Sequence, residues 1–412
     1  MMERRVVITA ESSITPIGRT RTDILDNLIN GVSGVKNLAE DSFLSKDVHS
    51  RVFGRIDYPI EYDFARQYRK TMGPVGYYAC QVVKEVLEKS GLDPDFITSG
   101  KLGVAFGSTH GSPTVQRNVY NIFLQGTDKD FLKINAADYL KSMVHTTAVN
   151  ITKMFGITGR VISSCTACTT SSQSIGYGYE AIKFGMQDAM VCGAADEYDT
   201  MTVAVFDNLL ASSTAFNDTP QLTPRPFDKK RDGLVVGEGA GALLLEEYEF
   251  AKKRGAEILA EIIGFACSNN GGDLIMPSVD GVTRTIKLGL ANAGISADEV
   301  EFVSSHATGT TIGDIVEAQS IKRVYGESPY VTGLKSYIGH IMGTCGVVEM
   351  IFTLYMMEKG IIVPTLNLDE IDERCGGIRH TRSLIEEKIN IAAVQNFAFG
   401  GVNTCLLIKR VE

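Results

Sequence analysis

The sequence predicts an α/β protein made of two similar halves. Residues 87–111 and 290–309 each show a helix end, a Gly in the C-cap position, an Asp-containing turn and a short apolar strand that ends in a polar loop. Residues 158–194 and 332–365 share a second pattern of strand, polar turn, helix and strand. Strands that alternate with helices are typical of βαβ units, so we expect a mainly parallel sheet.

The halves are predicted at residues 1–255 and 256–412. The boundary follows a charged amphipathic helix that ends at Gly255, and no low-complexity linker separates the halves. We therefore expect one shared core with functional sites at the junction. The longest irregular regions, 30–60 and 108–145, lie in the first half and suit a lid or an interface.

Charge and hydropathy restrict the class of protein. The formal net charge is −9, with 40 basic and 49 acidic residues, which argues against a nucleic-acid-binding or membrane-binding surface. The apolar run near the N-terminus has only the length of a strand, and no run approaches the roughly 18 apolar residues of a membrane-spanning helix. The prediction is a cytoplasmic protein with reduced cysteines.

Cys168 lies where a strand is expected to turn into a helix. A thiol at a helix N-terminus is next to free backbone N–H groups, which stabilise a thiolate and can receive an oxyanion. Cys168 is therefore a candidate nucleophile, although most cysteines in such segments are small buried apolar residues. Cys165 and Cys168 also form a C-x-x-C pattern, but no second pair follows at ligand spacing, so we expect no metal.

Two of the six histidines lie in loops at strand ends of the second half. His306 precedes a loop of Gly and Thr, and His340 lies between glycines ahead of a helix. Lys335 precedes His340 in the same loop, and Glu349 follows on the helix. A lone loop histidine is more often a surface residue. Functional side chains gather at strand ends in α/β proteins, however, so two such histidines together with Cys168 favour a site.

A G-x-G-x-G pattern occurs at Gly237, Gly239 and Gly241. A dinucleotide-binding fingerprint needs a helix after its glycines, whereas ALLLEE predicts a strand here. We interpret these residues as close-packing glycines and expect neither NAD nor FAD.

With these residues placed, the chain resembles the condensing enzymes of the thiolase superfamily, in particular the elongating β-ketoacyl-acyl carrier protein synthases, or type II ketosynthases. The resemblance runs along essentially the whole chain and is carried by VVIT and ITPIG near the start, TACTTSSQSIG (166–176), RPFDKKRDGLVVGEGAG (225–241), HATGTTIGD (306–314), LKSYIGHIMGTCGVVE (334–349) and NFAFGGVN (396–403). It implies a thiolase-like fold, in which two βαβ-rich halves form a five-layered αβαβα sandwich.

The resemblance also implies the activity: decarboxylative Claisen condensation of an acyl chain held on cysteine with malonyl-acyl carrier protein. The products are a β-ketoacyl-acyl carrier protein and CO2. The family's catalytic triad falls on Cys168, His306 and His340. Further roles carried over are an electrostatic role for Lys335 with Glu349 as its ion-pair partner, phosphopantetheine contacts by Thr308 and Thr310, gating by Phe399, and an oxyanion hole from the N–H groups of Cys168 and Phe399.

The partners implied are an acyl carrier protein and a second ketosynthase-like chain, in a homodimer or in a heterodimer with a chain-length factor. Phosphopantetheine arrives on the carrier, so the chain is expected to hold no cofactor of its own. Arg66, Arg69 and Lys70 gather in the helical stretch 64–73 and are the expected docking residues for an acidic carrier. The same charges also suit a solvated helix face.

Three positions depart from the family pattern. Ala307 replaces the glycine that usually follows the first histidine, so the loop must shift if this position needs a positive φ. Residues 271–281 replace a loop that contributes pantetheine contacts. His110 lies where the acyl pocket is usually lined by a small or aliphatic residue, which suggests an unusual chain such as an aryl polyene or a polyketide.

Two other functions remain open from the sequence. A thiolase needs a second active-site cysteine near the C-terminus, and Cys405 lies instead in a strand-like segment. A non-catalytic chain-length factor lacks the nucleophile that Cys168 supplies. Acyl chain length and pathway are open as well.

Overall fold

The computed structural model describes residues 3–38, 48–125 and 130–411. No helix in these ranges is both long enough and apolar enough to cross a membrane. The strands are β1 (Val6–Ile14), β2 (Val35–Asn37), β3 (Val52–Gly54), β4 (Leu102–Gly107), β5 (Val161–Ile162), β6 (Ala189–Asp196), β7 (Gly239–Glu247), β8 (Ala260–Asn269), β9 (Phe302–Ser304), β10 (Tyr330–Thr332), β11 (Ile361–Ile362), β12 (Arg379–His380), β13 (Ile385–Glu386), β14 (Ile391–Ala398) and β15 (Val402–Lys409). The α-helices are α1 (Arg21–Ile29), α2 (Arg66–Arg69), α3 (Pro74–Ser90), α4 (Pro94–Thr98), α5 (Pro113–Gln125), α6 (Ala136–Ser142), α7 (Thr146–Phe155), α8 (Thr170–Lys183), α9 (Thr200–Asn208), α10 (Tyr248–Lys253), α11 (Val279–Ala293), α12 (Gly313–Tyr325), α13 (Lys335–Ile338) and α14 (Cys345–Lys359).

The strand order confirms the internal repeat. The first half contributes β1-β7-β6-β4-β5 and the second contributes β8-β15-β14-β9-β10, with β12 added at the outer edge. In both series the first two pairings are antiparallel and the next two are parallel. The halves join where Val6–Ile8 of β1 pairs with residues 260–262 of β8.

The prediction of a mainly parallel sheet is wrong, because each half contains two antiparallel pairings followed by two parallel ones. β14 and β15 illustrate the cause. Only a short turn at Phe399–Gly401 connects them, and neighbouring strands joined by a tight turn run antiparallel, since a parallel pair needs a long crossover.

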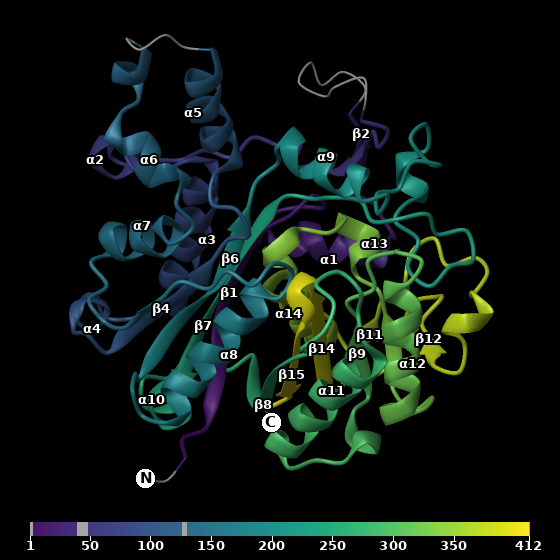
Figure 1. Ribbon diagram of the computed structural model, residues 1–412. Coiled ribbons are helices and arrows are strands. Elements are labelled where there is room, and N and C mark those ends of the chain that lie inside the picture. The colour runs from purple at the N-terminus through teal and green to yellow at the C-terminus, as the bar shows by residue number, and fades with distance from the viewer. Residues whose placement is uncertain (1–2, 39–47, 126–129, 412) are drawn as a thin grey trace.

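The five expected layers are present. α8 and α14 lie between the strands of the two halves and share one core with both. α3 and α7 cover the outer face of the first half, and α11 and α12 cover that of the second (Figure 1). Alternating side chains produce this arrangement: on β4, Ala105 faces the middle layer, while Val104 and Phe106 face α3 and α7.

The two irregular regions are more ordered than expected. Region 30–60 contains the hairpin of β2 and β3, and region 108–145 contains α5 and α6, which project together from the body in Figure 1. The remaining parts of these regions, 39–47 and 126–129, lie outside the described residues. For regions 30–60 and 108–145, a role as a lid or an interface stays a prediction. So does the role as acyl-pocket insertions that the family resemblance implies.

The glycine pattern at the start of β7 packs as predicted. Residues 239–247 form a strand, and a Cβ on Gly239 would lie 2.5 Å from the Ile14 oxygen. A Cβ on Gly241 would lie 2.7 Å from Val347 Cγ1 in α14. Both glycines therefore let β7 approach its neighbours, and the helix that a dinucleotide fingerprint needs does not follow them.

Candidate active site

Cys168 lies immediately before the N-cap of α8, as the sequence predicts. Thr169 is the N-cap residue, and Ala167 has a positive φ of 46°, which turns the chain sharply into the helix. The cysteine is only 6% exposed. The tight turn thus presents the thiol toward the junction of the two halves rather than toward solvent.

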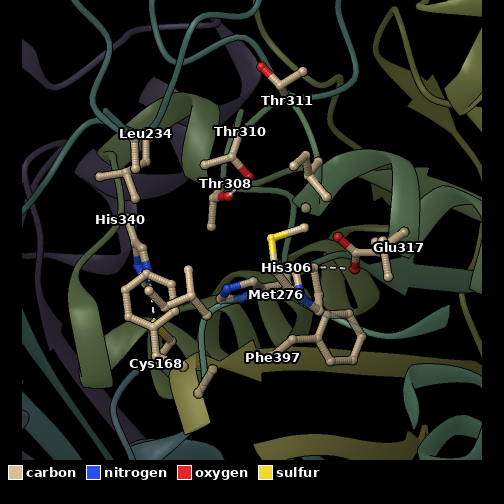
Figure 2. Close-up of a pocket in the computed structure, with 18 of the residues that line it drawn as sticks. Cys168, Leu234, Met276, His306, Thr308, Thr310, Thr311, Glu317, His340 and Phe397 are labelled. Carbon is tan, nitrogen blue, oxygen red and sulfur yellow. Dashed lines mark hydrogen bonds between the residues drawn. The ribbon is translucent and has the colours of Figure 1, made fainter. Parts of the chain in front are cut away.

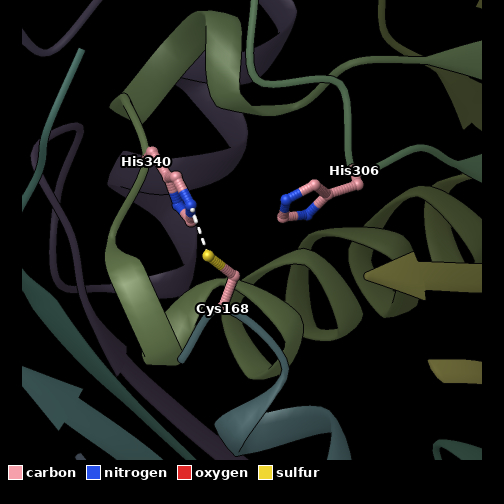
Figure 3. Close-up of side chains that lie close together, drawn as sticks. All are labelled: Cys168, His306 and His340. Carbon is pink, nitrogen blue, oxygen red and sulfur yellow. Dashed lines mark hydrogen bonds between the residues drawn. The ribbon is translucent and has the colours of Figure 1, made fainter. Parts of the chain in front are cut away.

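The two histidines converge on this thiol from the second half. Cys168 Sγ and the nearest ring nitrogens of His306 and His340 lie within 4.8 Å of one another (Figure 3). His340 Nε2 is 3.0 Å from Sγ, and the two imidazole rings are perpendicular, with centroids 5.4 Å apart. The structure therefore brings together the three residues that the resemblance assigned to a triad.

A buried ion pair supports His306. Lys335 Nζ lies 2.5 Å from Glu349 Oε1, and both side chains are fully buried. Burial opposes the charge on Lys335, but the Glu349 carboxylate outweighs it and raises the pKa of the Lys335 ammonium. Lys335 also donates to His306 Nδ1 at 3.2 Å, and Asn396 donates to Glu349 Oε2 at 2.7 Å.

His340 has a different partner at the same ring position. Its Nδ1 is 2.9 Å from Cys345 Sγ, at the start of α14. Burial raises the pKa of the Cys345 thiol well above its usual value, so this sulfur keeps its proton and donates. Burial and the Lys335 charge lower the pKa of both histidines, which are therefore neutral near pH 7. Because Nδ1 accepts in each ring, each Nε2 carries the proton.

The pKa of Cys168 differs from the sequence-based expectation. Burial raises it to about 11, against the lowering effects of Lys335 and of the backbone N–H groups of Cys168 and Phe399. Removing the sulfur from water thus raises the pKa by more than the helix N-terminus and the nearby positive charge lower it, so the resting thiol keeps its proton near pH 7. Both N–H groups nevertheless act on this sulfur, where an oxyanion hole was expected.

A cavity of about 310 Å³ leads to the three residues. Cys168, His306 and His340 line its buried end, and Thr308 and Thr310 line its wall, with their hydroxyl oxygens 3.0 Å apart. Figure 2 shows Thr308, Thr310, Met276 and His306 among the residues that line this cavity. The substituted loop 271–281 contributes Ile275, Met276 and Pro277 to the lining, so it supplies apolar rather than polar contacts.

Ala307 adopts a positive φ of 24° although it is not a glycine. Its N–H and that of His306 both donate to the Glu317 carboxyl group at 2.7 Å. The buried Asp314 holds the same loop by accepting from Gly309 N at 3.1 Å. Two buried carboxyl groups thus hold the backbone in a conformation that usually favours glycine.

Phe399 lies at the open end of the cavity. The residue is 38% exposed, and its ring stacks on that of Phe206 with centroids 5.9 Å apart. It belongs to the turn between β14 and β15, where Gly400 and Gly401 have positive φ angles of 83° and 70°. A gating role for this residue remains a proposal.

Other predicted residues lie elsewhere. His110 is half-buried and outside the cavity lining. Arg66, Arg69 and Lys70 are exposed on or next to α2, which is shorter than the predicted stretch 64–73, and none of them lines the cavity. Cys405 is fully buried in β15, away from this cavity.

The sequence did not single out Cys345, Asn396, Asp314 or Glu317. For Cys345, the clue was its short distance from His340 in the sequence: the two residues are five positions apart, and α14 starts at Cys345. For the carboxylates, the clue was the position of two acids on the helix that follows the His306 loop. Their burial and their partners only become evident from the packing.

Comparison with known proteins agrees with this geometry. The model of the β-ketoacyl synthase N-terminal domain matches residues 3–251, and that of the C-terminal domain matches residues 259–369. The chain is 34% identical to 3-oxoacyl-[acyl-carrier-protein] synthase 2 of Vibrio cholerae over 421 residues, which covers all of both chains.

Solved structures show the same fold. A β-ketoacyl synthase from Burkholderia phymatum superposes with a TM-score of 0.95 at 39% identity, covering 99% of this chain and 100% of that one. A chain from the complex of a type II PKS acyl-carrier protein with its ketosynthase superposes with a TM-score of 0.89 at 26% identity, with full coverage of both chains. Two matched domain models, full-length relatives and the shared fold show that the chain belongs to the β-ketoacyl synthase family of condensing acyltransferases.

Proposed function

We propose that Cys168, His306 and His340 carry out the decarboxylative condensation of an acyl chain with malonyl-acyl carrier protein. One observation carries the assignment of roles. Two neutral imidazoles, each with Nδ1 occupied by a buried donor, direct Nε2–H toward the same space beside the Cys168 sulfur.

The first half-reaction is acyl transfer. The Cys168 sulfur attacks the carbonyl carbon of the incoming thioester, and the carrier's thiol leaves with the proton that Cys168 loses. The N–H groups of Cys168 and Phe399, which act on the sulfur in the resting state, donate to the oxyanion that forms beside it. Because the pKa of the resting thiol is about 11, its proton must move as the carbon–sulfur bond forms.

The second half-reaction joins the chains. Cleavage of the malonyl carboxylate releases CO2 and leaves an enolate, whose oxygen accepts hydrogen bonds from the Nε2–H groups of His306 and His340. The enolate carbon attacks the Cys168 thioester, and the Cys168 thiolate leaves and takes up a proton from water. The product is a β-ketoacyl thioester two carbons longer. Lys335 contributes as a fixed positive charge that keeps His306 neutral, not as a base.

The proposed substrates arrive on phosphopantetheine carried by an acyl carrier protein. The support is an open cavity with a hydroxyl pair, Thr308 and Thr310, on its wall and Cys168 at its end. The similar ketosynthase that was solved with its acyl-carrier protein also favours such a partner. We propose that a second ketosynthase-like chain completes the enzyme. We also propose that His110 contacts the acyl chain, at a place outside the cavity described above.

Replacement of the histidines tests these roles. His306→Ala and His340→Ala should each lower malonyl-thioester decarboxylation by about 10²-fold, the usual effect of removing one oxyanion donor. Acyl transfer to Cys168, followed by mass spectrometry of the intact protein, should be partly retained in both variants. Cys168→Ala should abolish acyl transfer.

His49→Ala is the matched control, because His49 is exposed and lies outside the cavity lining. Decarboxylation at the parental rate in both site variants would remove the histidines from the mechanism. Acylation of the Cys168→Ala protein would refute the nucleophile.

A further inference from the structure

Arg231 is a buried cation that contacts the loop carrying Thr308 and Thr310. It belongs to the first half, ahead of β7, and its side chain is only 1% exposed. The Asp372 carboxylate of the second half lies 2.8 Å from its Nη1. A buried guanidinium is stable only when it is paired and its N–H groups are hydrogen-bonded, so its partners show which segments it holds.

The guanidinium grips two consecutive peptide carbonyl groups of this loop. Arg231 Nε donates to Thr310 O at 3.1 Å, and Nη2 donates to Thr311 O at 2.8 Å. These two N–H groups lie on one edge of a rigid plane, so they hold both oxygens in a fixed relation. On the other side, Nη1 donates to Asp228 O at 2.9 Å and to Asp372 Oδ2 at 2.8 Å.

The backbone just before Thr310 is held as well. Gly309 N donates to Asp314 Oδ1 at 3.1 Å, and Gly309 O accepts from Gly233 N at 3.2 Å. A Cβ on Gly313 would lie 2.5 Å from Thr310 Oγ1, so the first residue of α12 approaches this hydroxyl closely. The peptide groups on both sides of Thr310 are therefore fixed, and with them the direction of its Cα–Cβ bond.

The side chains that this loop presents line the cavity. Thr308 and Thr310 are half-buried in its wall, with their hydroxyl oxygens 3.0 Å apart, whereas Arg231 does not line it (Figure 2). We propose that Arg231 is a positioning residue that sets this hydroxyl pair for the phosphopantetheine arm. The inference rests on the proposed function, which assigns the arm to these threonines. Other residues, Lys335 and Cys345, hold the imidazoles, so loss of Arg231 should weaken binding of the arm rather than slow the chemistry.

Arg231→Lys is the decisive variant. Lysine keeps the positive charge for Asp372, but its single nitrogen cannot supply parallel donors to the Thr310 and Thr311 carbonyl oxygens. The readout is acylation of Cys168, followed by mass spectrometry of the intact protein. The half-saturating concentration of acyl-pantetheine should rise about fivefold, the value of one lost hydrogen bond. For the same acyl group on ethanethiol, which has no polar arm, it should change less than twofold.

A double-mutant cycle ties the effect to the threonine. Thr310→Val replaces the hydroxyl that Arg231 positions with a methyl group. In the Thr310→Val background, Arg231→Lys should therefore raise the half-saturating concentration of acyl-pantetheine less than twofold. A merely structural role would give the full increase in both backgrounds, because independent effects add in free energy.

Arg225→Lys is the matched control. Arg225 lies in the same sequence motif, its side chain is 4% exposed, and its Nε donates to the Asp228 carboxylate at 3.1 Å. Its other donors reach Leu222 O and the Asp369 carboxylate rather than the threonine loop. Both variants remove a buried guanidinium from one network, yet Arg225→Lys should leave the half-saturating concentration of acyl-pantetheine unchanged.

Asp372→Asn tests the same clamp without removing the buried cation. It keeps the shape of the side chain but takes away the negative partner of Arg231 Nη1. The half-saturating concentration of acyl-pantetheine should rise about threefold, within the range of one weakened hydrogen bond. That of the ethanethiol ester should again change less than twofold, so the proposal is tested even if Arg231→Lys does not fold.

Each other outcome overturns the proposal. Equal increases for acyl-pantetheine and for the ethanethiol ester, or the same increase in Arg225→Lys, would show that Arg231 only stabilises the fold. Unchanged values in Arg231→Lys would show that the hydroxyl pair does not depend on it. A Thr310→Val protein that takes acyl-pantetheine as readily as the parent would instead refute the threonine contacts of the proposed function, and the role of Arg231 with them.

Discussion

His306 and His340 reach the same protonation state through different neighbours. Lys335 donates to Nδ1 of His306, and the Cys345 thiol donates to Nδ1 of His340. Each contact leaves the proton on Nε2, which faces the Cys168 sulfur. A charged donor and a neutral donor therefore produce one common result, a pair of neutral imidazoles that donate into the site.

Cys345 is consequently predicted to be a positioning residue for His340. Cys345→Ala should lower decarboxylation about fivefold, the value of one neutral hydrogen bond of roughly 1 kcal/mol, without changing the KM of malonyl thioester. Cys345→Ser should restore most of the rate because its hydroxyl also donates. Nitrogen-15 NMR of labelled histidine should show protonated Nε2 at His340 in the parent and a tautomer mixture in Cys345→Ala.

The control is Cys192→Ala, which removes an equally buried thiol from β6, outside the cavity lining. If Cys345→Ser is as slow as Cys345→Ala, the sulfur acts by packing rather than by donating.

At the scale of elements, the site depends on how closely α8 and α14 approach. Gly346 lies in the first turn of α14, and a Cβ there would lie 2.0 Å from Ser172 Oγ in α8 and 2.7 Å from Asn396 Oδ1 in β14. Val347 N donates to Ser171 Oγ at 3.0 Å across the same contact. Because Glu349 follows on the same helix, this packing also determines where the partner of Lys335 lies.

Gly346→Ala is expected to destabilise the protein by about 1–3 kcal/mol, the usual cost of overpacking a close helix contact. Urea denaturation followed by circular dichroism measures it. Gly272→Ala is the matched control, since a Cβ there meets nothing within 4 Å. Equal stability of the two variants would show that α14 moves aside without cost.

For the whole molecule, buried carboxyl groups link folding to pH. Burial raises the pKa of Glu317 to about 8 and that of Glu197 to about 7. The side chain of Glu197 contacts the N-terminal ends of α3 and α5, where it accepts hydrogen bonds from Val75 N at 2.9 Å and from Thr114 N at 3.0 Å. The same carboxyl groups titrate near pH 4.5 in the unfolded chain. Between that pH and the raised pKa values, the folded chain therefore binds more protons than the unfolded chain.

Stability should therefore fall as pH rises from 6.5 to 8, where the unfolded groups are already ionised and the folded ones lose their protons. The expected loss is on the order of 1–2 kcal/mol. Urea midpoints across this range measure it. Glu197→Gln keeps a neutral side chain at all pH values and should flatten the slope, whereas a midpoint that increases with pH would contradict the burial of neutral carboxyl groups.

The sequence by itself determined the local features of this protein. The small residues after Cys168 start a helix, the loops at strand ends present His306 and His340, and the repeated pattern shows two halves. Each depends on residues within a few positions of one another, and turn and capping preferences act over that range. The family resemblance extended these features to the five layers and the triad.

Only the tertiary structure decided the rest. Three features depend on packing between segments that are distant in the chain, or on how a side chain turns within that packing. They are the raised pKa of Cys168, the antiparallel pairings next to the junction of the two halves, and the partner of each Nδ1. The contacts of Arg231 likewise join residues from three separate segments. Burial and side-chain direction are properties of the assembled layers, and no local pattern contains them, because desolvation acts through every atom that surrounds a group.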